Sequence, residues 1–293
     1  MTDKFPILEV AKASLLMPLN SPKNALKAIG LLLLAIVAVV VLMMVGFLVT
    51  GGDMAAFSDA VAGIEGMEPE ELGRTLGLLS GMGGGILGMF LGLFVLLGIS
   101  AYIFNYWVRF ATFGEERASF SSLGRAASAA AINGLKFILI FFLVGLVSFV
   151  INFVLSSFGL SRGIMEQAAI TDMTDQYLAG FTFNIIAVVV TCFAYSAFSA
   201  NLTQTAIGSD EEGMEHPHTI DFAVVLLLVY STLVIPLIIA AFIGSDGLFM
   251  AVQYILGLLI LFAIPAAHGL RYRICMAENV KQVFSGEEEK TEN

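Results

Sequence analysis

Charged residues are scarce in this chain, making up 13% of its 293 residues. Soluble domains carry roughly 25%, so this fraction excludes an ordinary soluble protein. Basic residues are the scarcer sign, 14 against 24 acidic ones, and they form no stripe of the kind that nucleic-acid binding needs. We therefore expect no nucleic-acid partner.

Residue types for catalysis and metal binding are also few, with three histidines and two cysteines. Cys192 and Cys275 both lie in apolar stretches, where each is expected to act as a small buried hydrophobic residue. The HExxH, CxxC and Gly-Lys-Ser/Thr patterns do not occur. We predict a non-enzymatic protein without a cofactor.

Long apolar runs dominate what is present. Hydrophobic residues make up 58% of the chain, and six runs are long enough to cross a hydrocarbon core of about 30 Å. We predict an all-α polytopic transmembrane helix bundle over residues 1–276, followed by an acidic cytoplasmic tail at 277–293. The six spans are expected near residues 26–49, 77–110, 137–158, 181–206 and 222–275, the last range holding two spans joined by a turn at 244–247.

Two further segments are predicted to lie along the membrane surface. Residues 5–17 place Glu9 and Lys12 on one side of a helix, which is typical of an interfacial amphipathic helix. The opposite side carries Ile7, Leu8, Ala11 and Leu15. Residues 118–131, rich in serine and alanine, predict a second interfacial or connecting helix. Pro236 and Pro265 lie inside the last two spans, where each should kink its helix.

The basic residues predict the orientation. With six spans, only Arg74 and Arg162 lie on one side of the membrane. The other side holds Lys4, Lys12, Lys23, Lys27, Arg109, Arg117, Arg125, Lys136, Arg271, Arg273, Lys281 and Lys290. Because cytoplasmic loops carry the excess of lysine and arginine, both termini of this multi-pass protein are expected to be cytoplasmic.

A glycine-rich face marks the second span. Six glycines fall within a helical sector of about 100°, namely Gly77, Gly81, Gly84, Gly85, Gly88 and Gly92. In lipid, such small residues let a second helix approach closely. We favour packing within the chain, and leave open contact with a second copy or a groove for a lipid or another apolar ligand.

Polar side chains in the spans are the candidates for contact with a ligand or lipid. They are Tyr102, Tyr106 and Arg109 in the second span, Asn184, Thr191, Tyr195 and Ser199 in the fourth, and Gln253, His268 and Arg271 in the sixth. The fourth-span group shares a helical sector of about 80°, which indicates either hydrogen bonds between helices or the lining of a polar path. We favour interhelical hydrogen bonds, because no charged residue lies near the middle of the membrane in this span. His268 could change charge near neutral pH, and Arg271 with Arg273 could contact anionic headgroups.

The loop before the fifth span holds the other two histidines. His216 and His218 flank Pro217, with Glu215 and Asp221 close in sequence. Such a set could bind a divalent metal, but its spacing matches no metal motif. We favour a solvated loop and predict no metal.

One region resembles known proteins. Residues 102–136, with Gly114, Phe120, the pair Leu123-Gly124 and the run Asn133-Gly134-Leu135-Lys136, resemble bacterial inner-membrane proteins with six helices and amphipathic connectors. The resemblance implies a bacterial inner-membrane location and assigns no functional residue.

Together these observations predict a non-enzymatic integral inner-membrane protein that packs with lipid, with a membrane protein partner or with a second copy of itself. The alternative is a small-solute or lipid transporter that uses a polar seam between the fourth, fifth and sixth spans.

Overall fold

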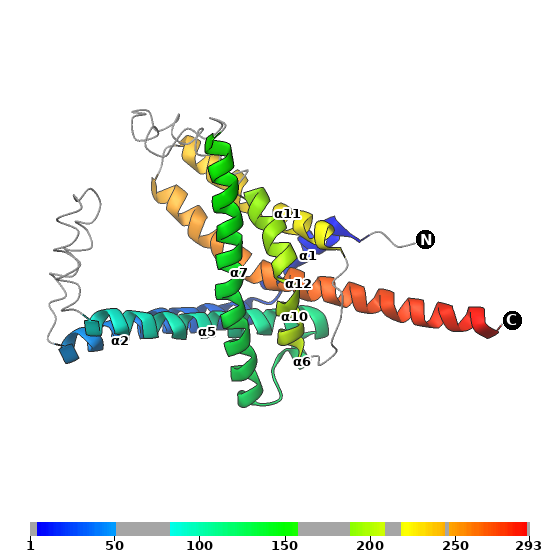
Figure 1. The fold of residues 1–293 in the computed structure, drawn as a ribbon, viewed down its shortest axis with the longest axis horizontal. Helices are drawn as coiled ribbons and strands as arrows, with labels where there is room; N and C mark the ends of the chain where they lie inside the picture. Colours follow the sequence, from blue (N-terminus) through cyan, green and yellow to red (C-terminus); the bar gives the residue numbers. More distant parts are fainter. Residues whose placement is uncertain (1–4, 51–82, 158–187, 209–217, 244–245, 292–293) are drawn as a thin grey trace. The chain divides into compact units, whose positions relative to one another are not determined.

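The computed structural model describes residues 5–50, 83–157, 188–208, 218–243 and 246–291, and all regular secondary structure in these ranges is helical (Figure 1). The chain divides into two compact units, residues 26–103 on one side and residues 1–25 with 104–293 on the other. Each unit is described by itself.

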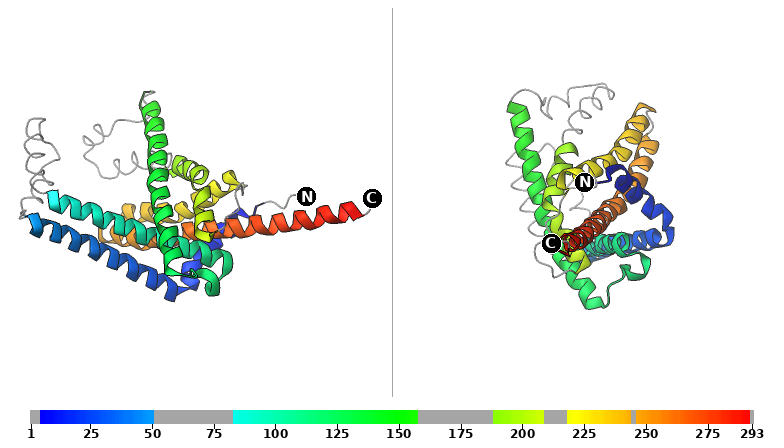
Figure 2. Two further views of the ribbon diagram at one scale, coloured as in Figure 1. Left: turned by 60° about the horizontal axis from the view of Figure 1, so that its bottom comes forward. Right: turned by 90° about the vertical axis from the view of Figure 1, so that its right-hand side faces the viewer.

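The unit of residues 26–103 is a pair of long apolar helices. α2 (Pro22–Thr50) belongs to it from Leu26 onward, and α5 (Gly83–Phe113) as far as Ile103. The two helices run side by side in both Figure 1 and Figure 2. Both are apolar around their whole circumference, the pattern of a helix surrounded by lipid or by other apolar helices.

In the part of the larger unit that the structure describes there are seven helical elements besides the start of α2 and the end of α5. Their bounds are α1 (Ile7–Asn20), α6 (Glu115–Ala118), α7 (Leu123–Ser157), the helix Val188–Phe198, α10 (Ala200–Ile207), α11 (Thr219–Ile243) and α12 (Asp246–Thr291). α1 packs against α11 and α12, which pack against each other, while α10 packs against α7 and α12.

The core of this unit lies where α1, α11 and α12 meet. Its fully buried residues come from all three helices and include Ala11, Phe222, Leu226, Val229 and Ala267. Cys192 and Cys275 are buried as expected. Small residues on α1 and α12 allow close approach of the α11 backbone, and the larger side chains of α11 fill the space between them.

Among the described residues, five helices are long and apolar enough to cross a membrane. They are Pro22–Val49, Gly83–Phe113, Leu123–Ile151, Thr219–Leu237 and Gly247–Met276. They correspond to five of the six predicted spans, and they are compatible with a multi-pass integral membrane protein. The fourth predicted span, 181–206, is described only from residue 188 onward.

The predicted connecting helix at 118–131 is not a separate element. α6 ends at Ala118, Ser119 is extended (φ −72°, ψ 145°), and α7 begins at Leu123 and continues to Ser157. The reason is composition: residues 126–131 are mostly alanine, the strongest helix former, and no proline separates them from the apolar run. Similarly, α12 continues as a helix to Thr291, through most of the predicted tail.

α1 forms close to the predicted interfacial segment, with a face that differs by one residue. Ile7 and Leu15 pack against the core and Ala11 is buried, whereas Leu8 is 67% exposed. The helix also continues through Pro18 to Asn20 instead of ending before it. A helix that lies on the membrane would bury its apolar side in lipid, but α1 buries most of it against α11 and α12.

Candidate functional site

The fourth predicted span is broken at Ser199. The helix Val188–Phe198 ends there, and α10 starts at the next residue. The Ser199 amide donates to the Tyr195 carbonyl at 2.8 Å, and the Ser199 carbonyl accepts from the Leu202 amide at 3.1 Å. Both bonds span three or four residues, so the amide and the carbonyl of Ser199 keep hydrogen-bond partners at the break.

His268 of α12 lies beside this break. Its Nε2 is 3.2 Å from the Tyr195 hydroxyl, and its Nδ1 is 3.2 Å from the Thr203 hydroxyl. The side chain is 1% exposed, and the rings of Phe104 and Phe222 lie 5.4 and 4.7 Å from the imidazole. Because a hydroxyl can donate or accept, either neutral tautomer of His268 is satisfied by these two partners.

Arg271 lies one turn further along α12 and is 2% exposed. Its guanidinium carbon is 4.7 Å from the centre of the Phe222 ring, and Nη2 is 3.5 Å from the Thr219 hydroxyl. The Ser196 hydroxyl donates to the Thr219 carbonyl at 2.6 Å. The start of α11 is therefore joined by polar contacts both to α12 and to the helix Val188–Phe198.

α7 and α5 supply polar partners for the backbone of α10. Asn133 Nδ2 donates to the Leu202 carbonyl at 3.0 Å and to Asn105 Oδ1 at 2.5 Å. Lys136 Nζ donates to the Asn201 carbonyl at 3.0 Å and to the Thr205 hydroxyl at 2.6 Å. These bonds fix α10 to α7 along most of its length.

Arg109 of α5 completes this arrangement at the C-terminal end of α10. It donates to the Ile207 carbonyl at 3.0 Å and, on its other side, to the carbonyls of Arg117, Ala118 and Ser119 at 3.1, 3.0 and 3.3 Å. Its guanidinium also lies 4.7 Å from the Phe120 ring centre. A cation at the C-terminal end of a helix is favoured by the helix dipole.

The result is a polar seam, defined as Asn105, Asn133, Tyr195, Ser196, Ser199, Thr203, Thr219, His268 and Arg271. Most of its members bond to each other or to backbone carbonyls. Within the described residues, the buried side-chain atoms without a hydrogen-bond partner include Asn105 Nδ2, Asn133 Oδ1 and the Ser199 hydroxyl. The seam is arranged mainly to join helices.

Several candidate residues named from the sequence lie in this seam and others do not. Tyr195, Ser199, His268 and Arg271 lie in it, and Thr191 is half-buried. Gln253 is exposed, and Asn184 is outside the described residues. Tyr102 is half-buried in the smaller unit, and Tyr106 stacks on Phe110 at 6.2 Å.

The seam members Asn105, Asn133, Ser196 and Thr219 were not predicted, and neither was Lys136, which bonds to α10. The sequence feature that could have indicated the seam is the pair of asparagines, Asn105 and Asn133, in otherwise apolar helices, because a buried amide needs a hydrogen-bond partner.

The glycine face of α5 lies against α2. A Cβ added to Gly88 would meet the backbone of Leu42 and Met43. A Cβ added to Gly92 would lie 2.7 Å from the Cα of Val39. A Cβ on Gly46 of α2 would in turn meet the backbone of Gly84, and one on Gly85 the Phe47 ring. Gly77 and Gly81 lie outside the described residues.

His218 directly precedes α11 and is held by contacts within the larger unit. Its Nδ1 is 2.9 Å from Asp221 Oδ2, and its ring stacks on Phe5 at 5.0 Å. It has a positive φ of 66°, which is uncommon outside glycine. His216 is outside the described residues, and among those described no group of three His, Cys, Asp or Glu could hold a metal ion.

A motif-like pattern follows α7 in the sequence. Residues 159–163 read Gly-Leu-Ser-Arg-Gly, which matches the Gly-x-Ser-x-Gly of hydrolase nucleophile elbows. That motif requires a strand directly before the serine, and the described residues just before it form the end of α7, a helix. The pattern itself lies outside the described residues and gives no support for hydrolysis.

Comparison with protein-family models, with curated proteins and with solved structures finds no match to this chain. The class of protein therefore follows from the helices alone, which are compatible with an integral membrane protein.

We expect Tyr195→Phe to lower the free energy of unfolding by about 0.6 kcal/mol, the mean for an interhelical hydrogen bond in a membrane. The change removes only the hydroxyl that contacts His268. Unfolding by titration with a denaturing detergent measures the effect. Tyr254→Phe is the control, because Tyr254 of α12 is 64% exposed. Equal effects of the two changes would show that the Tyr195 hydroxyl contributes nothing.

Proposed function

We propose that this chain is a non-enzymatic integral protein of a bacterial inner membrane that binds lipid or a membrane protein partner through its outer surface. It has six spans with both termini in the cytoplasm. In addition to the five long helices, the predicted span 181–206 crosses the membrane, because the mostly apolar sequence 181–187 precedes the helix Val188–Phe198. An even number of spans also keeps twelve of the 14 basic residues on one side.

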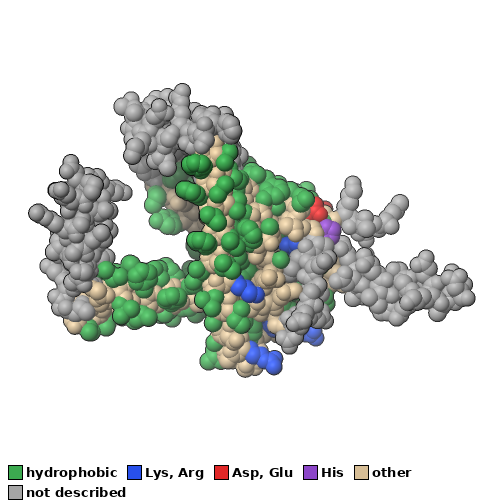
Figure 3. All heavy atoms as spheres, in the orientation of Figure 1, with side chains coloured by type: hydrophobic (Ala, Val, Ile, Leu, Met, Phe, Trp, Pro, Cys, Tyr) green, Lys and Arg blue, Asp and Glu red, His purple; other side chains and the backbone are tan. Residues whose placement is uncertain are grey.

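The observation that carries the proposal is the contrast between inside and outside. His268 and Arg271 are almost fully buried, whereas α7 presents large apolar side chains outward, with Phe141 64% and Phe142 67% exposed. Figure 3 shows such side chains along α7 and the α2–α5 pair. Large apolar patches on a protein surface mark contact with lipid or with a partner.

Topology is tested by cysteine labelling in intact cells, with single cysteines at the termini introduced as Thr2→Cys and Asn293→Cys. We expect a membrane-impermeant maleimide to label neither until the cells are permeabilised. Labelling of both in intact cells would reverse the proposed orientation, and labelling of only one would overturn the six spans. The native Cys192 and Cys275 are buried, and the unsubstituted protein is the control for their reaction.

One observation favours the alternative, a small-solute or lipid transporter. Broken helices with polar groups at the break form the binding sites of many transporters, and the buried Ser199 hydroxyl at this break has no partner among the described residues.

Proteoliposomes distinguish the two functions, with an entrapped pH-sensitive dye for protons and a fluorescent phospholipid for lipid movement. Under our proposal, the protein moves neither probe above empty vesicles. Movement that Asn184→Leu and Gln253→Leu abolish, in protein that still folds, would replace our proposal with the transporter.

A further inference from the structure

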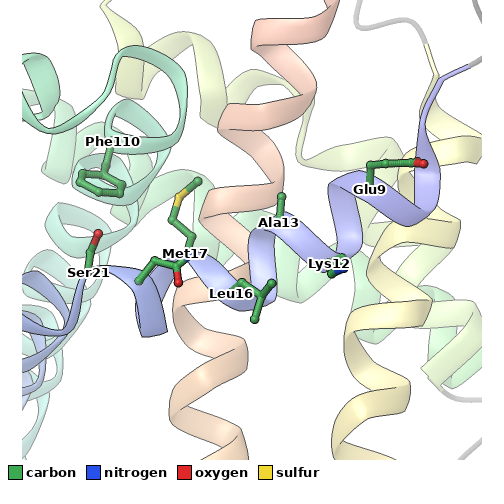
Figure 4. A pocket seen from close by; sticks show the side chains of 8 residues that line it. Glu9, Lys12, Ala13, Leu16, Met17, Ser21 and Phe110 are labelled. Carbon is green, nitrogen blue, oxygen red and sulfur yellow. The ribbon is translucent and has the colours of Figure 1, made fainter.

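An open groove of about 520 Å³ runs along one face of α1 (Figure 4). It is lined by Glu9, Lys12, Ala13, Leu16 and Met17 of α1 and by Phe110 of α5. The α1 residues recur at three- and four-residue spacing, so they share one side of the helix. The other side of α1 is buried and packs against α11 and α12. The side of α1 that lines the groove is therefore the one accessible to a ligand.

The charges in the groove lie at one end. Glu9 and Lys12 are three residues apart, so their backbone positions differ by about 4.5 Å along the helix axis. Side chains at this spacing commonly pair with each other. Here both are exposed, and neither forms an ion pair or hydrogen bond within the described residues. The groove thus presents one negative and one positive group side by side, each available to a ligand.

The rest of the groove is mostly apolar. Leu16 is 39% exposed, and Figure 4 shows Met17 extending from α1 toward Phe110, at the opposite end from Glu9. Asn20 and Ser21 also line this end and are uncharged. A ligand that fits must be amphiphilic, with two opposite charges at one end and an apolar chain at the other.

The apolar end of the groove lies at the ends of two long apolar helices. Ser21 directly precedes α2, and Phe110 lies three residues before the end of α5. Both residues are at the ends of helices long enough to span a membrane. The ends of such spans meet the interfacial region of the bilayer.

We propose that this groove binds a membrane phospholipid whose headgroup carries a primary ammonium beside its phosphate. The ammonium donates to the Glu9 carboxylate, Lys12 donates to the phosphate, and an acyl chain follows Leu16 and Met17 toward Phe110. This inference rests on the proposed lipid binding and specifies the lipid class.

Charge complementarity separates this lipid from the other common ones. An anionic headgroup without an ammonium would satisfy Lys12 but be repelled by Glu9. A choline headgroup has the two charges, but its quaternary nitrogen has no N–H to donate to the carboxylate. Charge-assisted hydrogen bonds are stronger than neutral ones, so the primary ammonium should be preferred.

The single tryptophan provides the measurement. Trp107 lies 5.3 Å from Phe110, ring centre to ring centre, and brominated acyl chains quench tryptophan at short range. The full-length protein is reconstituted in brominated phosphatidylcholine, and unbrominated phosphatidylethanolamine or phosphatidylglycerol is added as competitor. We expect phosphatidylethanolamine to relieve quenching about three- to fivefold more effectively than phosphatidylglycerol or unbrominated phosphatidylcholine, an effect of the size that a partly exposed charge pair produces.

Exposed charges on α1 can be changed without disturbing the core. Glu9→Gln and Lys12→Gln should each abolish the preference for phosphatidylethanolamine, and Lys23→Gln, at an exposed position outside the groove, should leave it intact. Equal relief by all three lipids, or an unchanged preference in the two groove variants, would overturn the inference.

The same experiment separates this inference from the proposed function. Quenching without headgroup preference leaves the lipid-binding function intact and rejects only the headgroup assignment. Absence of quenching by any brominated lipid would reject an acyl chain beside Phe110, and with it this inference, without bearing on lipid contact at the exposed face of α7.

Discussion

Gly88→Leu is expected to leave little folded protein. A Cβ at this position would lie within 3.0 Å of the Leu42 backbone in α2, and backbone cannot move aside as a side chain can. Overpacking of a close helix contact costs about 3 kcal/mol or more, and a leucine adds three further carbons beyond the Cβ. The fraction that elutes as a monodisperse peak in detergent, and its unfolding temperature, measure the loss.

Gly98→Leu is the matched control for this prediction. Gly98 lies on the same helix, and nothing within 4 Å would meet an added Cβ. The control should behave like the unsubstituted protein. If Gly88→Leu folds as well as Gly98→Leu, the glycine face is not a contact between α2 and α5 in the native protein.

Arg109→Met is expected to release the segment between α5 and α7. Arg109 donates to carbonyls at Arg117, Ala118 and Ser119 as well as at Ile207, and methionine retains only its apolar volume. Hydrogen bonds to a charged group contribute about 1.5–3 kcal/mol. We expect stability to fall by about 2 kcal/mol, and cleavage by a glutamate-specific protease after Glu116 to become faster.

Arg125→Met is the control for Arg109. Arg125 is exposed, and among the described residues its side chain bonds only to the nearby Ser121 hydroxyl at 3.4 Å. The protease should therefore cut this variant at the unsubstituted rate. The glutamate site is unaffected by either substitution, because neither removes a glutamate. Equal cleavage rates for the two variants would contradict a holding role for Arg109.

The apolar runs were sufficient to predict the long helices. A stretch such as 28–49 has no charge and no proline, so its length alone indicates a span. The glycine spacing also predicted a close-packed face, which lies against α2 at Gly88 and Gly92. These features depend on residues close together in sequence.

The break at Ser199 and the seam around it could not be predicted in the same way. Helical propensity is continuous through 181–206, and the break is stabilised by distant partners, such as the Thr219 carbonyl for Ser196 and Asn133 for Leu202. For the same reason, the sequence placed Leu8 on the packed side of α1. Which apolar residues of a short amphipathic helix are buried depends on the helices that it meets, here α11 and α12.

The packing of α1 has a consequence for the timing of folding. α1 ends at Asn20, yet its buried side contacts α11 and α12, which begin at Thr219 and Asp246. At synthesis rates of 5–20 residues per second, α1 waits roughly 10 to 40 s for these partners. During this interval its apolar side needs other cover, from the lipid surface or from a chaperone. A chain that stops before α11 would keep that side exposed and should be a preferred target for membrane quality-control proteases.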